Sequence, residues 1–354
     1  MQASAQKSGD AAVSSSRQRL LDTFNFAHPD KLPVVYHLSP AGLHVHGQKL
    51  LDLFNRLPPD NPVRFDRLPH PPATAVDADG RYHEMIRDEW GTLWECRIFG
   101  VHGHPKEYPF ASWSEGLGHP LPVVPRPGSE AWTREQGEVQ RDRQHYLVFK
   151  GWISIFEKLH ALRPIDEVLM DLATGENDIL PFLDRLVSHW LDVIRHYLEI
   201  GADVIMFGDD WGTQTGQLVS LPLFREVFKP RYARLMAPIK QAGKRVFFHS
   251  CGKLGPIFDE LLDLGIDGYW PQITLYEAEP FAQKCREHRV AIYIHPDRQR
   301  LIPLGTPAEI DHRIREYAER YRRLGGGGIF YVEIENDAPF ANVQALIEAI
   351  HRHR

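Results

Sequence analysis

The chain has 354 residues, of which 43% are hydrophobic and 25% are charged, and its formal net charge is −6. This composition is typical of a globular protein with a sizeable core, and the acidic balance argues against nucleic acid as a partner. No uncharged apolar stretch reaches the length of a membrane span, so we expect no membrane partner either. The three cysteines, Cys96, Cys251 and Cys285, show no paired spacing, which argues against a disulfide framework and favours a reducing, cytoplasmic location.

The first 19 residues are rich in Ser, Ala and Gln and lack the apolar core of a secretory signal. We expect residues 1–19 to form a disordered leader. No linker is visible further along, so residues 20–354 are predicted to form a single domain.

The first half of the chain is irregular. Residues 31–38 predict a first strand, and the alternating pattern of residues 88–96 predicts a β-hairpin arm. The stretch 102–134 is rich in Pro, Gly and Trp and predicts a long loop insertion over the mouth of the fold. Residues 146–149 predict a strand that resumes the regular pattern.

The second half repeats one theme, in which a β-rich run is followed by a polar loop and an amphipathic helix. The predicted strands are residues 202–207, 245–248, 266–270, 290–294 and 329–332, and the clearest helices are 221–240, 254–264 and 306–323. Strands that alternate with helices of this length predict βαβ units and a parallel sheet.

Unusual polar residues follow the carboxyl-terminal ends of five of these strands, which is where a (β/α)8 TIM barrel places its active site. A doubly wound open sheet also binds ligands there, but no G-x-G-x-x-G follows a strand in this chain. The sequence therefore favours an α/β fold of the TIM-barrel type with an irregular N-terminal half.

His249 and Cys251 stand at the end of one predicted strand, and residues two apart in an extended segment face the same side. An imidazole and a thiolate that converge in this way make a candidate zinc site, although a buried His and a small apolar Cys in an ordinary turn would show the same pattern.

Asp209 and Asp210 follow the preceding strand, so one should face the cavity and the other the wall or the next helix. They are candidate catalytic groups for proton handling, and helix capping is the alternative role. The residues expected to line a substrate or cofactor pocket are Tyr36, Trp152, Trp211, Gln214, Trp270, Gln272, His295, Asp297 and Gln299. For the Trp residues, simple core packing is the alternative.

Several motifs occur in the order of one known template: residues 208–214 (GDDWGTQ), 224–232 (FREVFKPRY), 248–252 (FHSCG) and 304–309 (LGTPAE). Over residues 195–354 the chain resembles the uroporphyrinogen decarboxylase superfamily, and more narrowly its zinc- and cobalamin-linked methyltransferase branch. The resemblance implies a (β/α)8 barrel with its site at the carboxyl-terminal mouth. The sequence Asp297-Arg298-Gln299 also reproduces the Asp-x-Gln motif of that family.

The methyltransferase branch holds zinc with a His-x-Cys pair and a third ligand after the last strand, usually Cys or His. The resemblance assigns the pair to His249 and Cys251 and the third ligand to Glu335, which departs from the usual residue types. Glu333 is the alternative to Glu335. A carboxylate is an acceptable zinc ligand, so we expect the site to survive.

The resemblance implies a zinc-dependent methyltransferase that acts on a small methylated molecule such as a methyl ether or thiol. Cobalamin would be bound by the barrel or delivered by a separate corrinoid protein, and a homodimer is compatible with the superfamily. The alternatives are a metal-free decarboxylase or lyase of a small carboxylic acid, which would use Asp210 and Arg298, and a non-enzymatic corrinoid- or ligand-binding module. Decarboxylation of the porphyrin precursor itself is disfavoured, because the arginine-rich signature of that reaction is missing from the early loops.

Overall fold

The computed structural model of the protein describes residues 14–63, 67–175 and 178–354. Seven strands form one parallel sheet in the order β1-β10-β9-β8-β7-β6-β5, and three form a small antiparallel sheet in the order β2-β3-β4. The strands are β1 (Val34–His37), β2 (Glu84–Arg87), β3 (Leu93–Cys96), β4 (His104–Glu107), β5 (Phe149–Ile153), β6 (Val204–Gly208), β7 (Arg245–Ser250), β8 (Gly268–Pro271), β9 (Ala291–Ile294) and β10 (Gly328–Glu333).

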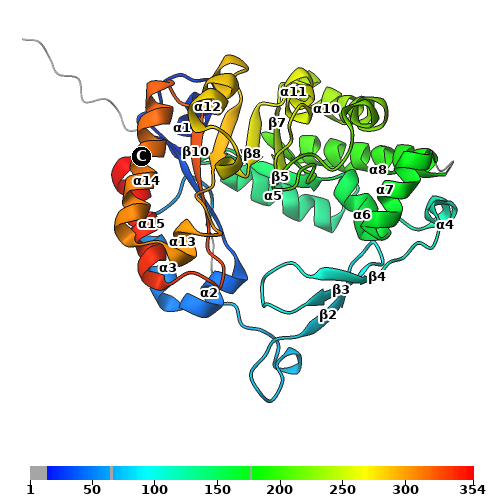
Figure 1. The fold of residues 1–354 in the computed structure, drawn as a ribbon, viewed down its shortest axis with the longest axis horizontal. Coiled ribbons are helices and arrows are strands. Elements are labelled where there is room, and N and C mark those ends of the chain that lie inside the picture. The colour runs from blue at the N-terminus through cyan, green and yellow to red at the C-terminus, as the bar shows by residue number, and fades with distance from the viewer. Residues whose placement is uncertain (1–13, 64–66, 176–177) are drawn as a thin grey trace, which may run out of the picture.

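Helices follow most of the parallel strands and cover the outside of the curled sheet (Figure 1). They are α1 (Ser16–Phe24), α2 (Pro40–His46), α3 (Gln48–Arg56), α4 (Trp113–Gly118), α5 (Glu130–Arg143), α6 (Phe156–Leu162), α7 (Ile165–Thr174), α8 (Ile179–Ile200), α9 (Leu221–Leu223), α10 (Lys229–Gln241), α11 (Ile257–Asp263), α12 (Ala278–Glu287), α13 (Leu301–Leu304), α14 (Pro307–Arg323) and α15 (Phe340–His353). Two short 3₁₀ turns, η1 (Ala73–Ala75) and η3 (Ile273–Leu275), and a π-helical turn, η2 (Phe224–Phe228), complete the set. None of the helices in the described ranges combines the length and apolar character needed to cross a membrane.

The parallel sheet curls as a TIM barrel does, but β1 and β5 do not pair in the described part of the chain. Residues Asp60 and Asn61 bind the open edge of β1 where an eighth strand would lie. The Val34 N–H donates to Asp60 Oδ2 at 3.0 Å, and the Tyr36 N–H donates to Asn61 Oδ1 at 2.9 Å. Side chains thus satisfy backbone groups that an eighth strand would otherwise pair.

Helix α1 closes the amino-terminal end of the barrel. Leu20 and Phe24 pack with inward-facing residues of the strands, such as Val35 and Phe247. Arg19 is buried and binds Asp30 and Asp60. The predicted leader is therefore too long, because residues from Ser16 onward belong to the domain; residues 1–13 lie outside the described residues.

The stretch 102–134 is more ordered than its composition suggests. It contains β4, α4 and the start of α5. Trp113 stacks near Phe182 of α8, with ring centroids 5.2 Å apart, and its Nε1–H donates to Asp171 Oδ2 at 2.8 Å. This apolar contact draws α4 onto the flank of the barrel. The hairpin arm predicted over residues 88–96 is present, but only its second strand, β3, lies in that range, and β2 precedes it. The β2-β3-β4 sheet projects from the body on the side where α2 follows β1 (Figure 1).

Candidate metal centre and adjoining pocket

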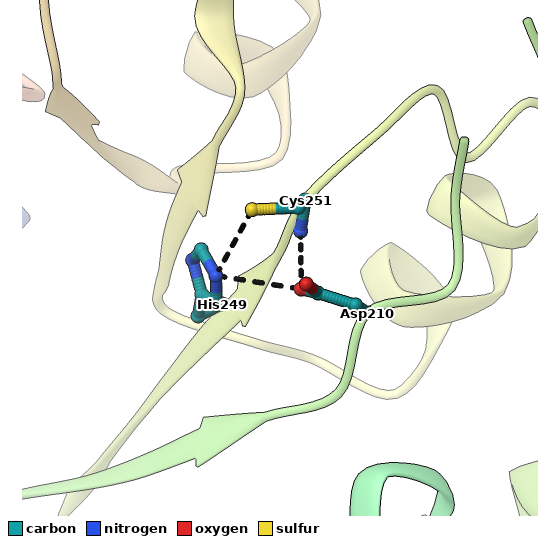
Figure 2. Close-up of side chains that lie close together, drawn as sticks. All are labelled: Asp210, His249 and Cys251. Atoms are coloured by element: carbon teal, nitrogen blue, oxygen red, sulfur yellow. Dashed lines mark hydrogen bonds and ion pairs between the residues drawn. The ribbon is translucent and has the colours of Figure 1, made fainter. Parts of the chain in front are cut away.

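The loops after β6 and β7 bring three side chains together at the carboxyl-terminal edge of the sheet. The register places Gly208 of β6 beside His249 of β7, and Asp210 and Cys251 follow two residues later on each loop. Figure 2 shows the Asp210, His249 and Cys251 side chains converging on one point. The prediction that His249 and Cys251 share a face is confirmed.

The three donor atoms lie at the spacing of metal ligands. His249 Nε2 is 3.4 Å from Asp210 Oδ1 and 3.5 Å from Cys251 Sγ, and the three donor atoms lie within 4.8 Å of one another. Zinc bonds of about 2.0–2.3 Å at tetrahedral angles place neighbouring ligand atoms about 3.3–3.6 Å apart. The His249 distances therefore match two edges of a zinc tetrahedron, and the set of one nitrogen, one sulfur and one oxygen fits that ion.

The orientation of His249 is fixed by the backbone. Its Nδ1–H donates to the carbonyl oxygen of Trp270 at 3.0 Å, which leaves the Nε2 lone pair facing Asp210 and Cys251. Burial lowers the pKa of His249, so the imidazole is neutral at physiological pH. Burial likewise raises the pKa of the Cys251 thiol to about 12, so the thiol keeps its proton until a cation replaces it.

Close contact between two loops holds Asp210 next to Cys251. The Cys251 N–H donates to Asp210 Oδ1 at 2.6 Å, and the Lys253 N–H donates to the Thr213 carbonyl at 2.7 Å. Gly252 has a φ of +79°, and a Cβ there would lie 2.1 Å from the carbonyl carbon of Gly212. Only glycine allows the loops to approach this closely.

Asp209 and Asp210 diverge, as predicted for consecutive residues. The Asp209 side chain is fully buried and accepts hydrogen bonds from the N–H groups of Ile155 and Glu157, both at 2.7 Å, and from the Tyr232 hydroxyl at 2.5 Å. It therefore anchors the start of α6 and does not face the cavity. The catalytic assignment of Asp209 is corrected to a structural one, and Asp210 is the member of the pair that faces the site.

Two predicted pocket residues point away from the donor group. Trp211 is fully buried between Phe156 and Phe228, each with a ring centroid 4.6 Å away, and is part of the core. The Tyr36 hydroxyl donates to the Leu57 carbonyl at 2.7 Å and lies 2.8 Å from His351, so it points into the helical layer. Tyr36 nevertheless borders the barrel interior together with its neighbours in β1, Val35 and His37.

A cavity of 200 Å³ lies directly beside the donor group, and most of the predicted pocket residues line it. Its wall includes His249 and Cys251 together with Gln214, Trp270, Gln272, His295, Asp297, Arg298 and Gln299. The side-chain amides of Gln214 and Gln272 meet at 3.1 Å. Asp297 Oδ1 accepts the N–H groups of Gln299 and Arg300, which shapes the loop after β9.

His295 and Trp270 form the floor of this cavity. The Trp270 indole N–H donates to His295 Nδ1 at 3.2 Å, and burial lowers the pKa of His295 to about 3. His295 is therefore a neutral hydrogen-bonding group at all physiological pH values. The Trp270 ring lies 4.2 Å from that of His249, and the Trp152 ring lies 5.3 Å from it, so two indoles pack against the imidazole.

Glu333 and Glu335 do not belong to the donor group. Glu333 lies 3.6 Å from His37 and 3.4 Å from Arg298, and burial raises its pKa. Glu335 lines a small neighbouring cavity with Glu333 and Arg298. The assignment of either residue as third ligand stays a prediction, and the carboxylate that lies beside His249 and Cys251 in this structure is that of Asp210.

The structure adds three further residues to the surroundings of the site. Glu157 accepts a hydrogen bond from Trp152 Nε1 at 3.3 Å, and burial raises its pKa to about 8. Tyr293 and Tyr331 point into the barrel beneath Trp270. Each stands two residues before a predicted pocket or ligand residue, His295 and Glu333, so the two-residue period of a strand could have found them.

Comparisons with known proteins identify the family of this chain. A family profile described as Uroporphyrinogen decarboxylase (URO-D) matches residues 161–353, which is more than half of the chain and includes all three donors. The chain belongs to the uroporphyrinogen decarboxylase family. A search of curated protein sequences gave no match.

Among solved structures, this member of the uroporphyrinogen decarboxylase family is similar to a methyltransferase from Methanosarcina mazei. The identity is 18%, the TM-score is 0.59, and the match covers 96% of this chain and 98% of the other. A dihydropteroate synthase from Xanthomonas albilineans matches with 14% identity and a TM-score of 0.33 over 56% of this chain and 64% of the other. A xylose isomerase-like TIM barrel protein from Mycobacterium smegmatis matches with 13% identity and a TM-score of 0.29 over 64% of this chain and 89% of the other. The first of these likenesses shows that the barrel architecture extends over nearly the whole chain.

Proposed function

We propose that this protein is a zinc-dependent methyltransferase that exchanges a methyl group between a corrinoid and a small substrate such as a methyl ether or thiol. The observation that carries the proposal is the convergence of Asp210, His249 and Cys251, in which the distances from His249 Nε2 to Asp210 and to Cys251 match two edges of a zinc tetrahedron. The likeness in fold to the Methanosarcina mazei methyltransferase supports the same reaction class.

Three ligands leave one tetrahedral position for a substrate. A zinc ion held by these residues supplies Lewis acidity, which lowers the pKa of a thiol or polarises an ether oxygen. The carbonyl of Trp270 keeps the Nε2 lone pair of His249 directed toward Asp210 and Cys251, where it would bind the ion. Trp152 and Trp270 pack against the imidazole of His249, and the cavity of 200 Å³ offers Gln214 and Gln272 as polar contacts for a small substrate.

The test is the metal content of the purified protein, compared with Cys251→Ala, Asp210→Asn and Glu335→Ala. We expect about one zinc per chain in the wild type, none in Cys251→Ala, and weakened binding in Asp210→Asn. The control is Cys96→Ala, which removes a buried cysteine from the β2-β3-β4 sheet and should keep its zinc. Loss of zinc in Glu335→Ala with retention in Asp210→Asn would restore Glu335 as the third ligand.

Activity is followed through the absorption of the corrinoid, either in transfer from methylcobalamin to a thiol or from a methyl ether to cob(I)alamin. Undiminished activity in zinc-free Cys251→Ala would refute the proposal. The second candidate is a metal-free decarboxylase, and it is favoured by Arg298, a half-exposed guanidinium in the wall of the same cavity that can hold a carboxylate. Wild-type protein without stoichiometric zinc, and with release of carbon dioxide that depends on Asp210 and Arg298, would establish that alternative.

A further inference from the structure

We propose that a cleft beside α5 and α8 binds a small methylated ammonium ion, at a site separate from the metal centre. The cleft has a volume of 160 Å³, which is smaller than the sites of drug-sized ligands and suits a small ion. It is bounded by the two helices, the turn 88–92 and the segment 122–125, and it shares no lining residue with the cavity beside Cys251. The wall residues on which the proposal rests are Glu89, Trp90, Glu135, His189, Trp190 and Tyr197.

The turn before β3 supplies two of these residues. Asp88 Oδ1 accepts the N–H groups of Trp90 and Thr92, both at 2.9 Å, so one carboxylate fixes the shape of the turn. The Thr92 hydroxyl donates to the carbonyl of Ala161 at 2.8 Å and ties the turn to α6. Glu89 and Trp90 are thereby held at the edge of the cleft.

The wall of the cleft is aromatic. The rings of Trp90 and Trp190 meet with centroids 5.6 Å apart and an interplanar angle of 44°. The Trp190 indole N–H donates to the carbonyl of Ser154 at 2.7 Å, which fixes the orientation of that ring. Tyr197 stands two turns further along α8. The faces of such rings attract cations, and indole attracts them most strongly.

The charged groups of the wall are carboxylates. Glu89 makes no hydrogen bond or ion pair within the described part of the chain, and Glu135 accepts a hydrogen bond from His196 Nε2 at 3.0 Å. Among the described residues, no Lys or Arg lines the cleft. Burial raises the pKa of Tyr197, and the charges of Glu135 and Glu89 raise it further, so both carboxylates act on that side of the cleft. The wall therefore favours a cation.

Neighbouring cations do not form ion pairs with these two carboxylates. The Lys158 ammonium lies 4.4 Å from the centroid of the Trp90 ring, but Lys158 is not part of the wall. Arg185 donates to two backbone carbonyls, and Arg195 is paired with Asp192 at 2.7 Å. A cationic ligand would thus meet carboxylates that no salt bridge of the protein already occupies.

The imidazole of His189 is a polar group without a partner in this wall. It is 9% exposed, and neither ring nitrogen makes a hydrogen bond to another described residue or is sealed off within the protein. Burial lowers its pKa, so the ring is neutral and one nitrogen keeps its lone pair. Most buried polar groups are hydrogen-bonded, and the N–H of an ammonium ligand would satisfy this one. The ligand that fits all these features is a methylated ammonium ion that keeps one N–H.

Trimethylammonium is the probe, and its binding is measured by titration with ligand-observed NMR. We expect a dissociation constant of about 1 mM, because the site is partly open to water and its ionic contacts are screened. tert-Butanol has the same shape without the charge and should not bind at the same concentrations. Ammonium, which lacks the methyl groups that contact the rings, should compete poorly.

The carboxylates are tested by Glu89→Gln and by the double variant Glu89→Gln/Glu135→Gln. We expect about threefold weaker binding in the single variant and about tenfold weaker binding in the double variant. The matched control is Glu199→Gln, which removes the same charge from an exposed position of α8 outside the cleft and should leave the affinity unchanged.

The aromatic part of the wall is tested by Tyr197→Leu, which keeps an apolar side chain and removes the ring. The affinity should fall about threefold in protein whose urea midpoint shows that it is folded. If this variant does not fold, the comparison of trimethylammonium with tert-butanol and the Glu89→Gln titration still decide the proposal.

Three results would overturn it: no binding of trimethylammonium to the wild type at tens of millimolar, equal binding of tert-butanol, or equal affinity in the double variant. A loss in Glu199→Gln as large as that in Glu89→Gln would also do so, because the attraction would then come from the net charge of the protein. Cys251→Ala should bind the probe as the wild type does. The proposal therefore does not depend on zinc or on methyl transfer, and the two proposals fail separately.

Discussion

The imidazole of His249 and the backbone carbonyl of Trp270 are joined by a hydrogen bond of 3.0 Å, and this contact decides which nitrogen of His249 is available to a metal. The two residues are paired in register on β7 and β8. Because a carbonyl oxygen can only accept, Nδ1 must carry the hydrogen and Nε2 the lone pair. The pairing of β7 with β8 thus leaves the Nε2 lone pair of His249 free to bind a metal ion.

The first prediction concerns the pH dependence of zinc binding. Burial raises the pKa of the Cys251 thiol to about 12 and lowers that of His249, so at neutral pH the thiol is protonated and the imidazole is neutral. Zinc must displace one proton, from the thiol, and the apparent association constant should rise about tenfold per pH unit between about pH 7 and 9. Competition with a chromophoric chelator measures the slope. Wild-type protein whose zinc affinity does not change over this range would show that the thiolate is not a ligand.

The second prediction concerns the different roles of two neighbouring carboxylates, Asp209 in stability and Asp210 in zinc binding. Asp209→Asn places an amide N–H₂ among three hydrogen-bond donors, so we expect a loss of about 2–3 kcal/mol in the free energy of unfolding. Asp210→Asn keeps an oxygen for the Cys251 N–H but loses the charge that faces His249, so it should weaken zinc binding and leave stability within about 0.5 kcal/mol.

Urea unfolding and zinc titration of both variants check this pair. Each variant is the control of the other, since the substitution is the same and the positions are adjacent. Equal destabilisation by the two substitutions would contradict the division of roles described here.

Features of this site that depend on neighbouring residues could be predicted from the sequence. Features that depend on contacts between residues far apart in the sequence could not. The convergence of His249 and Cys251 follows from strand geometry within three residues, and it was predicted correctly. That Asp209 and Asp210 diverge is equally local. Which of them faces the cavity was not predictable, because it is decided by the N–H groups of Ile155 and Glu157, more than fifty residues earlier.

The remaining differences have the same origin. Asp210 lies beside His249 and Cys251 because Gly212 and Gly252 let two loops touch, and no pattern within either loop reveals that contact. Trp211 is of a residue type that often lines pockets, but here it packs among phenylalanines of the core. The barrel was predicted from its alternating strands and helices, whereas the open edge of β1 depends on Asp60 and Asn61, in a segment without strand pattern.

The third prediction concerns the amino-terminal end of the barrel. Burial alone would raise the pKa of Asp203, but the hydrogen bond from Arg17 at 2.6 Å and the charges of Arg17 and Arg143 outweigh it and lower the pKa from 3.8 to about 2. A lowered pKa stabilises the folded state above about pH 4, and this contribution is lost as the pH falls toward 2. Asp203→Asn should therefore cost about 1–2 kcal/mol at pH 7 and much less at pH 2.5.

Unfolding by urea at both pH values measures this difference. Asp259→Asn, at an exposed ion pair with Lys284, serves as the control and should change stability by less than about 0.5 kcal/mol at either pH. A cost of Asp203→Asn that is the same at pH 7 and pH 2.5 would contradict the assigned role of the Arg17 contact.

The last prediction tests whether contact between the two loops positions the metal ligands. Gly252→Ala keeps all three donors, but its Cβ would lie 2.1 Å from the backbone of Gly212, and its φ of +79° is unfavourable for alanine. The loops must separate, which draws Cys251 away from Asp210, and zinc affinity should fall at least about tenfold. Gly216→Ala lies in the loop after β6 with nothing within 4 Å of its added Cβ, so it should bind zinc as the wild type does. If Gly252→Ala binds zinc normally while Gly216→Ala does not, the donors are held by some other contact than the one between these glycines.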